Sequence, residues 1–413
     1  MHHFNEYLNH INKISMIKSL YVAAACLLGA TACTPTVKTD NALPDWAFGG
    51  FERPEGVNPL ITPNQQTVFA CPMKGEEVKW EFADTFNPAA VVKDGKIYIL
   101  YRAEDDPTAG IGGRTSRIGL VETADGTTID SRRDTPVMYP DTTEVSRTYE
   151  WKGGCEDPRV VLAEKDGKPF YVMTYTGWNN QTPRLCIATS DDLLTWTHQG
   201  PAFLDALDGK YKDLACKSGS IVTEVKDGEQ RAAKVKINGE DKYLMYWGEA
   251  WVCAATSDDL IHWEPYVDAD KNLIHLIDTR DGYFDSGLTE CGPPAIITDN
   301  GILLFYNGKN KSGDKGDPDY PEKTYAAGQV LFSLDNPYEV KGRLDKPFFR
   351  PMVDFEKSGQ YVDGTVFIEG LVYHQDKWYL YYGCADSMVG VAVYDPAKRS
   401  GYGDPVKLAQ PQE

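Results

Sequence analysis

The sequence predicts an all-β fold, a five-bladed β-propeller, and three observations support this prediction. Two nine-residue segments, ATSDDLLTW at 188–196 and ATSDDLIHW at 255–263, are near copies that begin 67 residues apart. A strand rich in β-branched and aromatic residues recurs five times along the chain. Four of these strands follow a short polar turn, and a further apolar strand precedes each turn. Repeated units of three or four strands at this period are typical of propeller blades.

Each predicted unit has an apolar strand, a turn, a second strand and a third strand that ends in an Asp-containing turn. The second strands are YILYRA (98–103), YVMTYTG (171–177), YLMYWGE (243–249), ILLFYNG (302–308) and YLYYGC (379–384). We interpret the SDDLxxW segments as structural, with an Asp-rich turn and a Trp that packs between blades. The alternative is a β-sandwich with accidental internal similarity, which the near-identical copies disfavour.

The N-terminal segment has the pattern of a bacterial export signal. Lys18 precedes an apolar run, and small residues lead to Ala30-Thr31-Ala32-Cys33. We therefore expect a signal peptide over 1–33 with a lipidated Cys33, a tether over 34–50 and a single propeller domain over 51–405. The alternative is a plain secretory signal that is cut near Ala32. The expected location is the periplasm or the cell surface, with the membrane reached only through the lipid anchor.

The charge and the cysteine pattern exclude several kinds of partner. The 413 residues carry a formal net charge of −19, which disfavours binding to nucleic acid or to an anionic membrane surface. A neutral ligand such as a sugar is compatible with this charge. The cysteines are scattered without a CxxC pair, and the histidines show no HExxH spacing. The sequence therefore predicts neither a metal site nor a cofactor.

Polar residues stand where the first strands of the five units begin and where the second strands end. Antiparallel neighbours bring these ends to one face, so we expect the polar groups to converge near the axis. The predicted set is Asn87, Arg102, Glu156, Asp157, Arg159, Lys217, Glu249, Glu290, Asn307, Asp363 and Asp386, with aromatic neighbours Tyr101, Trp178, Trp247, Trp251 and Tyr361. Paired carboxylates are the groups that cleave glycosides. For any single acid, an ordinary salt bridge to Arg102 or Arg159 is the competing interpretation.

Five segments resemble glycoside hydrolase family 130. They are FNPAAVVKDGKIYILYRA, GCEDPRVV, RLCIATSDDLLTW, ECGPPAIITDNGILLFYNG and YYGCADSMVGVA, in this order over about residues 50–400. The resemblance implies a five-bladed propeller that acts on β-mannosides and inverts the anomeric centre. It implies that most related enzymes are phosphorylases, in which inorganic phosphate attacks C1. A smaller group are hydrolases that resemble β-1,2-mannosidases.

The resemblance also implies roles for individual residues. Asp157 matches the general acid, which in the phosphorylases acts through a sugar hydroxyl, and Asp386 matches the mannose-binding aspartate. Asn87 and Arg102 match positions near the same sugar, and Arg184 and Lys217 resemble retained phosphate positions. Glu156 and Arg159 are expected to orient Asp157. Arg159, Asn307 and Asp363 complete the predicted substrate-binding set.

The chain departs from the phosphorylase pattern where phosphate would bind. Glu249 ends a strand at which the phosphorylases carry a basic residue, Asn307 replaces a histidine, and Glu290 is an added acid. Two like charges 4 Å apart repel by about 4 kcal/mol at an effective dielectric near 20. We therefore expect an inverting hydrolase in which Asp157 is the acid and Glu249 and Glu290 position and activate water. A β-mannoside phosphorylase that releases mannose-1-phosphate is the alternative, and a lipid-anchored glycan-binding protein is the alternative of another class.

Overall fold

The computed structural model describes residues 43–110 and 112–397, and every structural statement below concerns these residues. The predicted signal peptide with Cys33 lies outside them, as do most of the predicted tether and the last predicted residues of the domain. Within the described ranges, no helix has the length and apolar character needed to cross a membrane.

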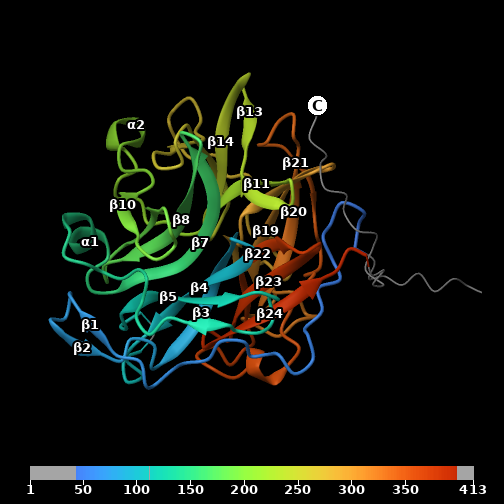
Figure 1. Cartoon of the computed structure of the whole chain (residues 1–413). Helices are drawn as coiled ribbons and strands as arrows, with labels where there is room; N and C mark the ends of the chain where they lie inside the picture. The colour runs from blue at the N-terminus through green and yellow to red at the C-terminus, as the bar shows by residue number, and fades with distance from the viewer. Residues whose placement is uncertain (1–42, 111, 398–413) are drawn as a thin grey trace, which may run out of the picture. The chain divides into compact units, whose positions relative to one another are not determined.

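Two groups of antiparallel strands form the first half of the described chain (Figure 1). The first group contains β3 (Asp84–Lys93), β4 (Lys96–Glu104), β5 (Ser116–Thr123) and β6 (Ser131–Arg132), and the second contains β7 (Gly154–Lys165), β8 (Lys168–Trp178), β9 (Pro183–Ser190) and β10 (Thr197–Pro201). One parallel bridge between Ser116 and Gly154 joins the groups. Gly154 has φ = 109°, and an added Cβ would lie 2.1 Å from the Ser116 carbonyl oxygen, so this close approach requires glycine.

Three further antiparallel groups follow along the chain. The third group contains β11 (Gly219–Lys226), β12 (Glu229–Ala232), β13 (Lys234–Ile237), β14 (Glu240–Trp247), β15 (Cys253–Ser257) and β16 (Glu264–Pro265). The fourth group contains β17 (Leu288–Cys291), β18 (Ala295–Thr298), β19 (Gly301–Lys309), β20 (Tyr325–Phe332) and β21 (Val340–Arg343). The fifth group contains β22 (Val366–His374), β23 (Lys377–Cys384) and β24 (Met388–Tyr394). The remaining elements are β1 (Phe69–Cys71), β2 (Glu76–Val78), α1 (Glu144–Tyr149), α2 (Ala206–Gly209) and the 3-10 turn Asp354–Glu356.

The hydrophobic core is divided among the interfaces between these groups. Large buried clusters lie between the first and second groups, the second and third, the third and fourth, and the fourth and fifth. A further cluster packs Ile99 and Val121 of the first group against Val372 and Tyr381 of the fifth. The prediction of an all-β fold is confirmed, and the closed five-bladed arrangement stays a prediction.

The repeated Asp turn is structural, as its sequence indicates. Asp192 Oδ1 accepts hydrogen bonds from the amides of Leu194 and Thr195, both at 2.8 Å, and Trp196 Nε1 donates to the Leu193 carbonyl. The second copy, around Asp259, repeats all three bonds. These side chains hold a tight turn and bury a Trp, which gives the most visible repeat in the sequence a structural role.

The segment before the first strand packs on the fifth group. Phe48, which the sequence places in the tether, is fully buried, and its ring meets Trp378 edge-on at 5.0 Å between centroids. The Gln329 side chain exchanges two hydrogen bonds with the Phe48 backbone. Glu52 and Ile61 then bridge to β24. Residues 46–50 therefore belong to the folded domain.

Candidate active site

A cavity of about 390 Å³ lies where the polar strand ends converge. Its charged and amide-bearing lining residues are Asn87, Arg102, Glu104, Glu156, Asp157, Lys217, Glu249, Glu290, Gln360 and Asp386. Aromatic side chains, Phe86, Trp178, Tyr325, Tyr361 and Phe367, line the rest. A polar floor with aromatic walls suits a sugar, which presents hydroxyl groups at its edges and C–H groups on its faces.

Backbone irregularities aim the polar side chains into this cavity. β3 and β7 each carry a bulge, at Asn87 and at Asp157, and these two residues have φ values of 45° and 51°. Ser218 and Asp386 are also left-handed, with φ values of 59° and 51°. Non-glycine residues in this region cost free energy and cluster at functional sites. Bulges re-aim side chains beside active sites, and both devices meet here.

One guanidinium holds three carboxylates on the cavity floor. Arg102 donates from Nη1 to Asp157 Oδ1 at 2.9 Å and from Nη2 to Glu104 at 2.7 Å and Glu156 at 2.9 Å. Its guanidinium carbon also lies 4.7 Å from the centroid of the Phe86 ring. Glu104 in turn accepts from Arg114 at 3.0 Å. Arg102 is therefore committed to the acids around it, and it fixes one oxygen of Asp157.

Asp157 is held as a carboxylate in the free protein. Burial by itself would raise the pKa of Asp157, but the charges of Arg102 and Lys217 and a 2.9 Å hydrogen bond from Asn87 lower that pKa to about 2. The adjacent Glu156 behaves differently, because burial raises its pKa despite the opposing charge of Arg102. The two neighbouring carboxylates are therefore not equivalent.

A second carboxylate centre lies across the cavity. Burial raises the pKa of Glu290 to about 8, and the charge of Glu249 adds to the effect, while Lys217 opposes it. The Ser218 hydroxyl donates a short hydrogen bond to Glu290 Oε1. Burial would lower the pKa of Lys217, but the surrounding carboxylates raise it above its usual value, so its ammonium group stays charged. This centre holds a proton on Glu290 near neutral pH.

Asp386 lies at the start of the turn after β23 and completes the cavity. Burial raises its pKa to about 7, with Arg102 opposing and Asp157 adding to the rise. Its backbone carbonyl accepts from Gln360 Nε2 at 2.7 Å, which fixes the turn while the carboxyl group faces the cavity. Near pH 7 the Asp386 carboxyl group is therefore partly protonated, so it can both donate a hydrogen bond to a sugar hydroxyl and accept one from it.

Four predicted site residues do not line the cavity. The Arg159 guanidinium is buried beneath it, and the Asn307 amide exchanges two hydrogen bonds with the backbone of Ile368. Arg184 pairs with Asp213 at 3.2 Å and stacks over Tyr149. Asp363 is exposed, and its carbonyl accepts from Thr324. Of the predicted aromatic neighbours, Trp178 and Tyr361 line the cavity, whereas Tyr101, Trp247 and Trp251 do not.

The sequence reasoning missed several lining residues. Glu104 lines the cavity and directly follows Ala103, at the end of the second strand of the first unit. Ser218, which bonds to Glu290 without lining the cavity, stands between the predicted Lys217 and the first strand of the third unit. Their position next to predicted residues is the signal that could have found them. Tyr325 and Phe367 lie within apolar strand segments, where no local pattern separates them from core residues.

One group of described residues has the donor types of a metal site. Possible ligand atoms of Glu150, Cys155 and His198 lie within 4.8 Å of one another. However, Glu150 Oε1 already accepts from the Tyr175 hydroxyl at 2.6 Å and contacts His198 Nδ1 at 2.7 Å. Burial also raises the pKa of the Cys155 thiol well above its usual value. The three residues therefore form a hydrogen-bonded network in the core.

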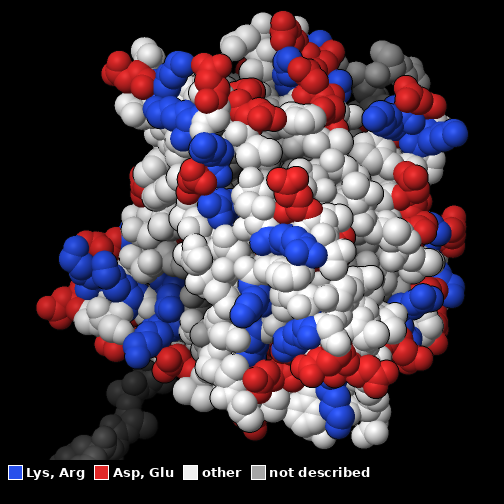
Figure 2. Space-filling view, turned by 90° about the vertical axis from the view of Figure 1, so that its left-hand side faces the viewer, with Lys and Arg blue, Asp and Glu red and all other residues white. Residues whose placement is uncertain are grey.

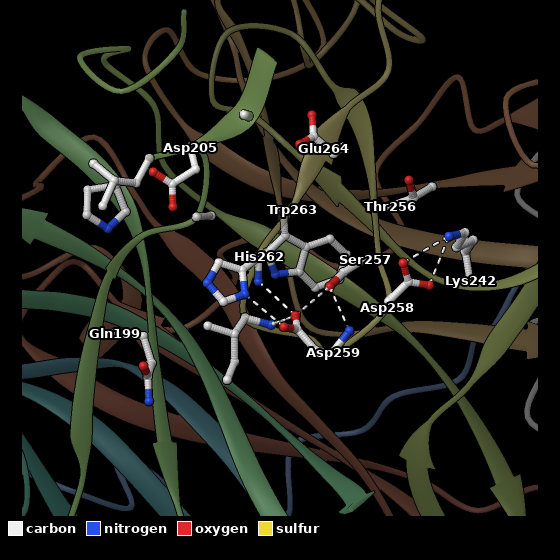
Figure 3. Close-up of a pocket in the computed structure, with 15 residues that line it drawn as sticks. Gln199, Asp205, Lys242, Thr256, Ser257, Asp258, Asp259, His262, Trp263 and Glu264 are labelled. Atoms are coloured by element: carbon white, nitrogen blue, oxygen red, sulfur yellow. Dashed lines mark hydrogen bonds and ion pairs between the residues drawn. The ribbon is translucent and has the colours of Figure 1, made fainter. Parts of the chain in front are cut away.

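A second cavity, of about 350 Å³, lies over the Asp turn of the third group (Figure 3). Lys242 there pairs with Asp258, and Asp259 bonds to His262 and to the turn (Figure 3). Burial would raise the pKa of Asp259, but hydrogen bonds from His262 and from the Ile261 amide lower it to about 2, so this shift comes from the local bonds of the turn. On the outer surface, acidic and basic side chains both occur on the face that Figure 2 shows.

Comparisons with known proteins match most of the chain. A family model described as beta-1,4-mannooligosaccharide phosphorylase matches residues 59–398. The 1,2-beta-oligomannan phosphorylase of Thermoanaerobacter sp. (strain X514) is 32% identical over 330 residues, covering 78% of this chain and 94% of the relative. A solved glycosyl hydrolase from Bacteroides ovatus is 59% identical with a TM-score of 0.83, covering 89% of this chain and 99% of its own. A solved structure described as "The GH130 family of mannoside phosphorylases contains glycoside hydrolases that target beta-1,2 mannosidic linkages in Candida mannan" is 58% identical with a TM-score of 0.84, at the same coverage. The chain therefore belongs to glycoside hydrolase family 130.

Proposed function

We propose that the protein is an inverting glycoside hydrolase that removes mannose from β-mannosides, with β-1,2-linked mannan oligosaccharides as the substrate class. The carboxylate content of the cavity carries this proposal. Six acids line the cavity, Glu104, Glu156, Asp157, Glu249, Glu290 and Asp386, against the two bases Arg102 and Lys217. A phosphate dianion would meet the carboxylate of Glu249 at a cost of several kcal/mol at close range, whereas a water molecule would not.

In the proposed reaction, Asp157 supplies the proton to the leaving group and Glu290 takes a proton from water. Water then attacks C1 from the opposite face, so the C1–O glycosidic bond breaks as a new C1–O bond forms. Ser218 occupies Oε1 of Glu290 and leaves Oε2 for the water. Glu249, which is less buried, orients that water from the rim. Asp386 and Asn87 hold mannose hydroxyl groups.

In the free cavity, the pair of Asp157 and Glu290 carries the number of protons that this reaction needs from it. Between about pH 2 and pH 8, Asp157 is ionised and Glu290 is protonated, so the pair carries one proton. An inverting pair also needs one proton, but on the acid. Substrate binding must therefore move the proton from Glu290 to Asp157.

Phosphorolysis is the second candidate reaction, and the curated relatives favour it. A 1,2-beta-oligomannan phosphorylase and a beta-1,2-mannobiose phosphorylase, both from Thermoanaerobacter sp. (strain X514), are 32% and 28% identical to this chain. Lys217 also places one cation in the cavity. Glycan binding without turnover is a third possibility, and the release of product in a catalytic assay would exclude it.

The experiment uses a panel of β-mannobioses that differ in linkage, with release of mannose measured in phosphate-free buffer. The proposal expects hydrolysis, fastest with the β-1,2 linkage. The variants E249A and E290A are assayed singly and together, and the double variant is expected to lose hydrolysis. Retained hydrolysis in the double variant would show that the assigned water-activating groups are wrong.

We also propose two features of the arrangement and location of the chain. The buried clusters between consecutive strand groups, including one between the last and the first, support a closed five-bladed propeller. The lipobox-like segment supports export and a lipid anchor on Cys33. Metabolic labelling with a radioactive fatty acid tests the anchor, because the wild type should be labelled and C33A should not.

A further inference from the structure

A single buried arginine connects the strands that lead into the two carboxylate centres. Arg159, on β7, donates from Nη1 to the Asp157 backbone carbonyl at 2.9 Å. From Nη2 and Nε it donates to the carbonyls of Cys291 and Gly292, at 2.8 and 3.1 Å. These two residues directly follow Glu290. The guanidinium therefore spans the gap between the second and fourth strand groups and contacts the backbone of both.

A buried glutamate from a third strand group holds this arginine. Glu369 lies at the bulge of β22, and its Oε1 is 3.0 Å from Arg159 Nη2. Glu369 is 0% exposed and Arg159 is 2% exposed. Neither Glu369 oxygen accepts a hydrogen bond of good geometry from the described residues. A buried carboxyl group with so few partners is costly, so its presence calls for a role that compensates for this cost.

We propose that Arg159 and Glu369 form a positioning pair that sets the separation between Asp157 and Glu290, without touching the substrate. Inversion requires a carboxyl separation of roughly 6.5–9.5 Å, which leaves room for water. Asp157 and Glu290 come from different strand groups, so no hydrogen bonds within one group fix their distance. The rigid, planar guanidinium of Arg159 fixes this distance by donating to three backbone carbonyls, and Glu369 keeps the guanidinium in place. The inference rests on the proposed roles of Asp157 and Glu290.

Stability alone accounts poorly for this arrangement. A buried ion pair contributes little net stability, because desolvation offsets its Coulombic attraction. The three carbonyls that Arg159 binds lie at or beside the two catalytic candidates rather than elsewhere in the core. Asp285 offers a matched comparison, because it is also 0% exposed and pairs with Arg280 and Arg343 at 2.9 and 2.6 Å, yet it does not line the cavity.

The test compares E369Q and R159K with the control variant D285N in the full chain. Steady-state kinetics are measured on whichever reaction, hydrolysis or phosphorolysis, the wild type catalyses. E369Q keeps the side-chain shape, and R159K keeps the charge but loses the fork. We expect kcat to fall at least tenfold in both, with KM changed less than threefold, because small misplacements of reacting groups mainly affect the chemical step. D285N should lower the melting temperature and leave kcat within twofold.

Crystal structures of the wild type and E369Q give a readout that needs no activity. The distance between the Asp157 and Glu290 carboxyl groups should change by at least about 0.5 Å, a shift that impairs preorganised sites. An unchanged distance, or a kcat within twofold of wild type, would overturn the proposal. If E369Q is insoluble, R159K decides by the same criteria. A wild type inactive on every β-mannoside would refute the proposed function, while the structural comparison would still decide the positioning role.

Discussion

Arg102 Nη1 donates to Asp157 Oδ1 at 2.9 Å, and the same guanidinium binds Glu104 and Glu156 through Nη2. This contact keeps Asp157 ionised in the free protein and leaves its other oxygen available. The same cation neutralises neighbours that would otherwise repel one another. The geometry of the proposed acid therefore depends on one side chain from a neighbouring strand group.

Replacing Arg102 should damage both stability and activity. R102A leaves three buried carboxylates without their shared cation, and breaking a buried pair typically costs about 3–5 kcal/mol. We expect a loss of this size in the free energy of unfolding, measured by urea denaturation, and at least a hundredfold fall in kcat/KM. K315A is the control, because Lys315 and Asp281 form an exposed pair whose loss should leave the free energy of unfolding nearly unchanged. Equal losses in the two variants would refute the shared-cation account.

Asp157 and Glu156, the adjacent carboxylates of GCEDPR, should differ in how much their substitution lowers kcat. D157N removes the proton donor, and general acid catalysis contributes about 10²–10⁴-fold, so kcat should fall within that range while the protein stays folded. E156Q removes a carboxylate that shares Arg102 but is assigned no proton transfer. Its kcat should fall less than tenfold. A larger loss in E156Q than in D157N would assign the acid to Glu156.

The pH profile should show an alkaline limb. The free pair of Asp157 and Glu290 carries one proton between about pH 2 and pH 8, and the reaction needs one proton, so titration of this pair should not lower kcat/KM in that range. Above pH 8 the proton is lost, and kcat/KM should fall about tenfold per pH unit. A kcat/KM that rises through pH 8 would contradict this proton count.

Replacing Ser218 should shift the pH at which kcat/KM begins to fall. Its hydrogen bond to Glu290 lowers the pKa of Glu290, so S218A should raise this pKa and shift the alkaline limb to higher pH. The measurement is kcat/KM across pH 6–10 for both proteins. S358A is the control, because the Ser358 hydroxyl donates to the Asp354 carbonyl on the exposed surface. A limb that stays in place, or moves to lower pH, would show that Glu290 does not cause it.

The N-terminal aromatic segment should stabilise the domain without affecting chemistry. Phe48 is fully buried against Phe305 and Trp378, and truncating such a side chain typically costs about 3–5 kcal/mol. F48A should therefore unfold at lower urea concentration with an unchanged KM. M352A is the control, because Met352 is 61% exposed. If F48A and M352A unfold at the same concentration, the packing of this segment contributes nothing.

The repeat and the strand ends could be predicted because they depend on local sequence. The Asp turns recur with their bonding side chains at fixed offsets, and Asp157, Glu249 and Asp386 stand where apolar strands begin or end. The contacts between strand groups could not be predicted in this way. Asn307 ends a strand as these residues do, yet its amide bonds to the backbone of Ile368 in the next group.

Two other residues show the same limit. Glu369 interrupts an apolar strand, FIEGLVY, and its partner Arg159 lies more than 200 positions earlier. Phe48 precedes the first strand by many residues, and only the packing of distant aromatic rings shows that it belongs to the core. Spacing within a unit is visible in one sequence, whereas packing between units depends on how the units associate.

The most direct test of the central proposal follows β-1,2-mannobiose by ¹H NMR with and without inorganic phosphate. The proposal predicts free mannose that appears first as the α-anomer, at a rate that phosphate does not increase. Formation of mannose-1-phosphate, in proportion to the disaccharide consumed and only when phosphate is present, would contradict hydrolysis and establish the phosphorylase reaction.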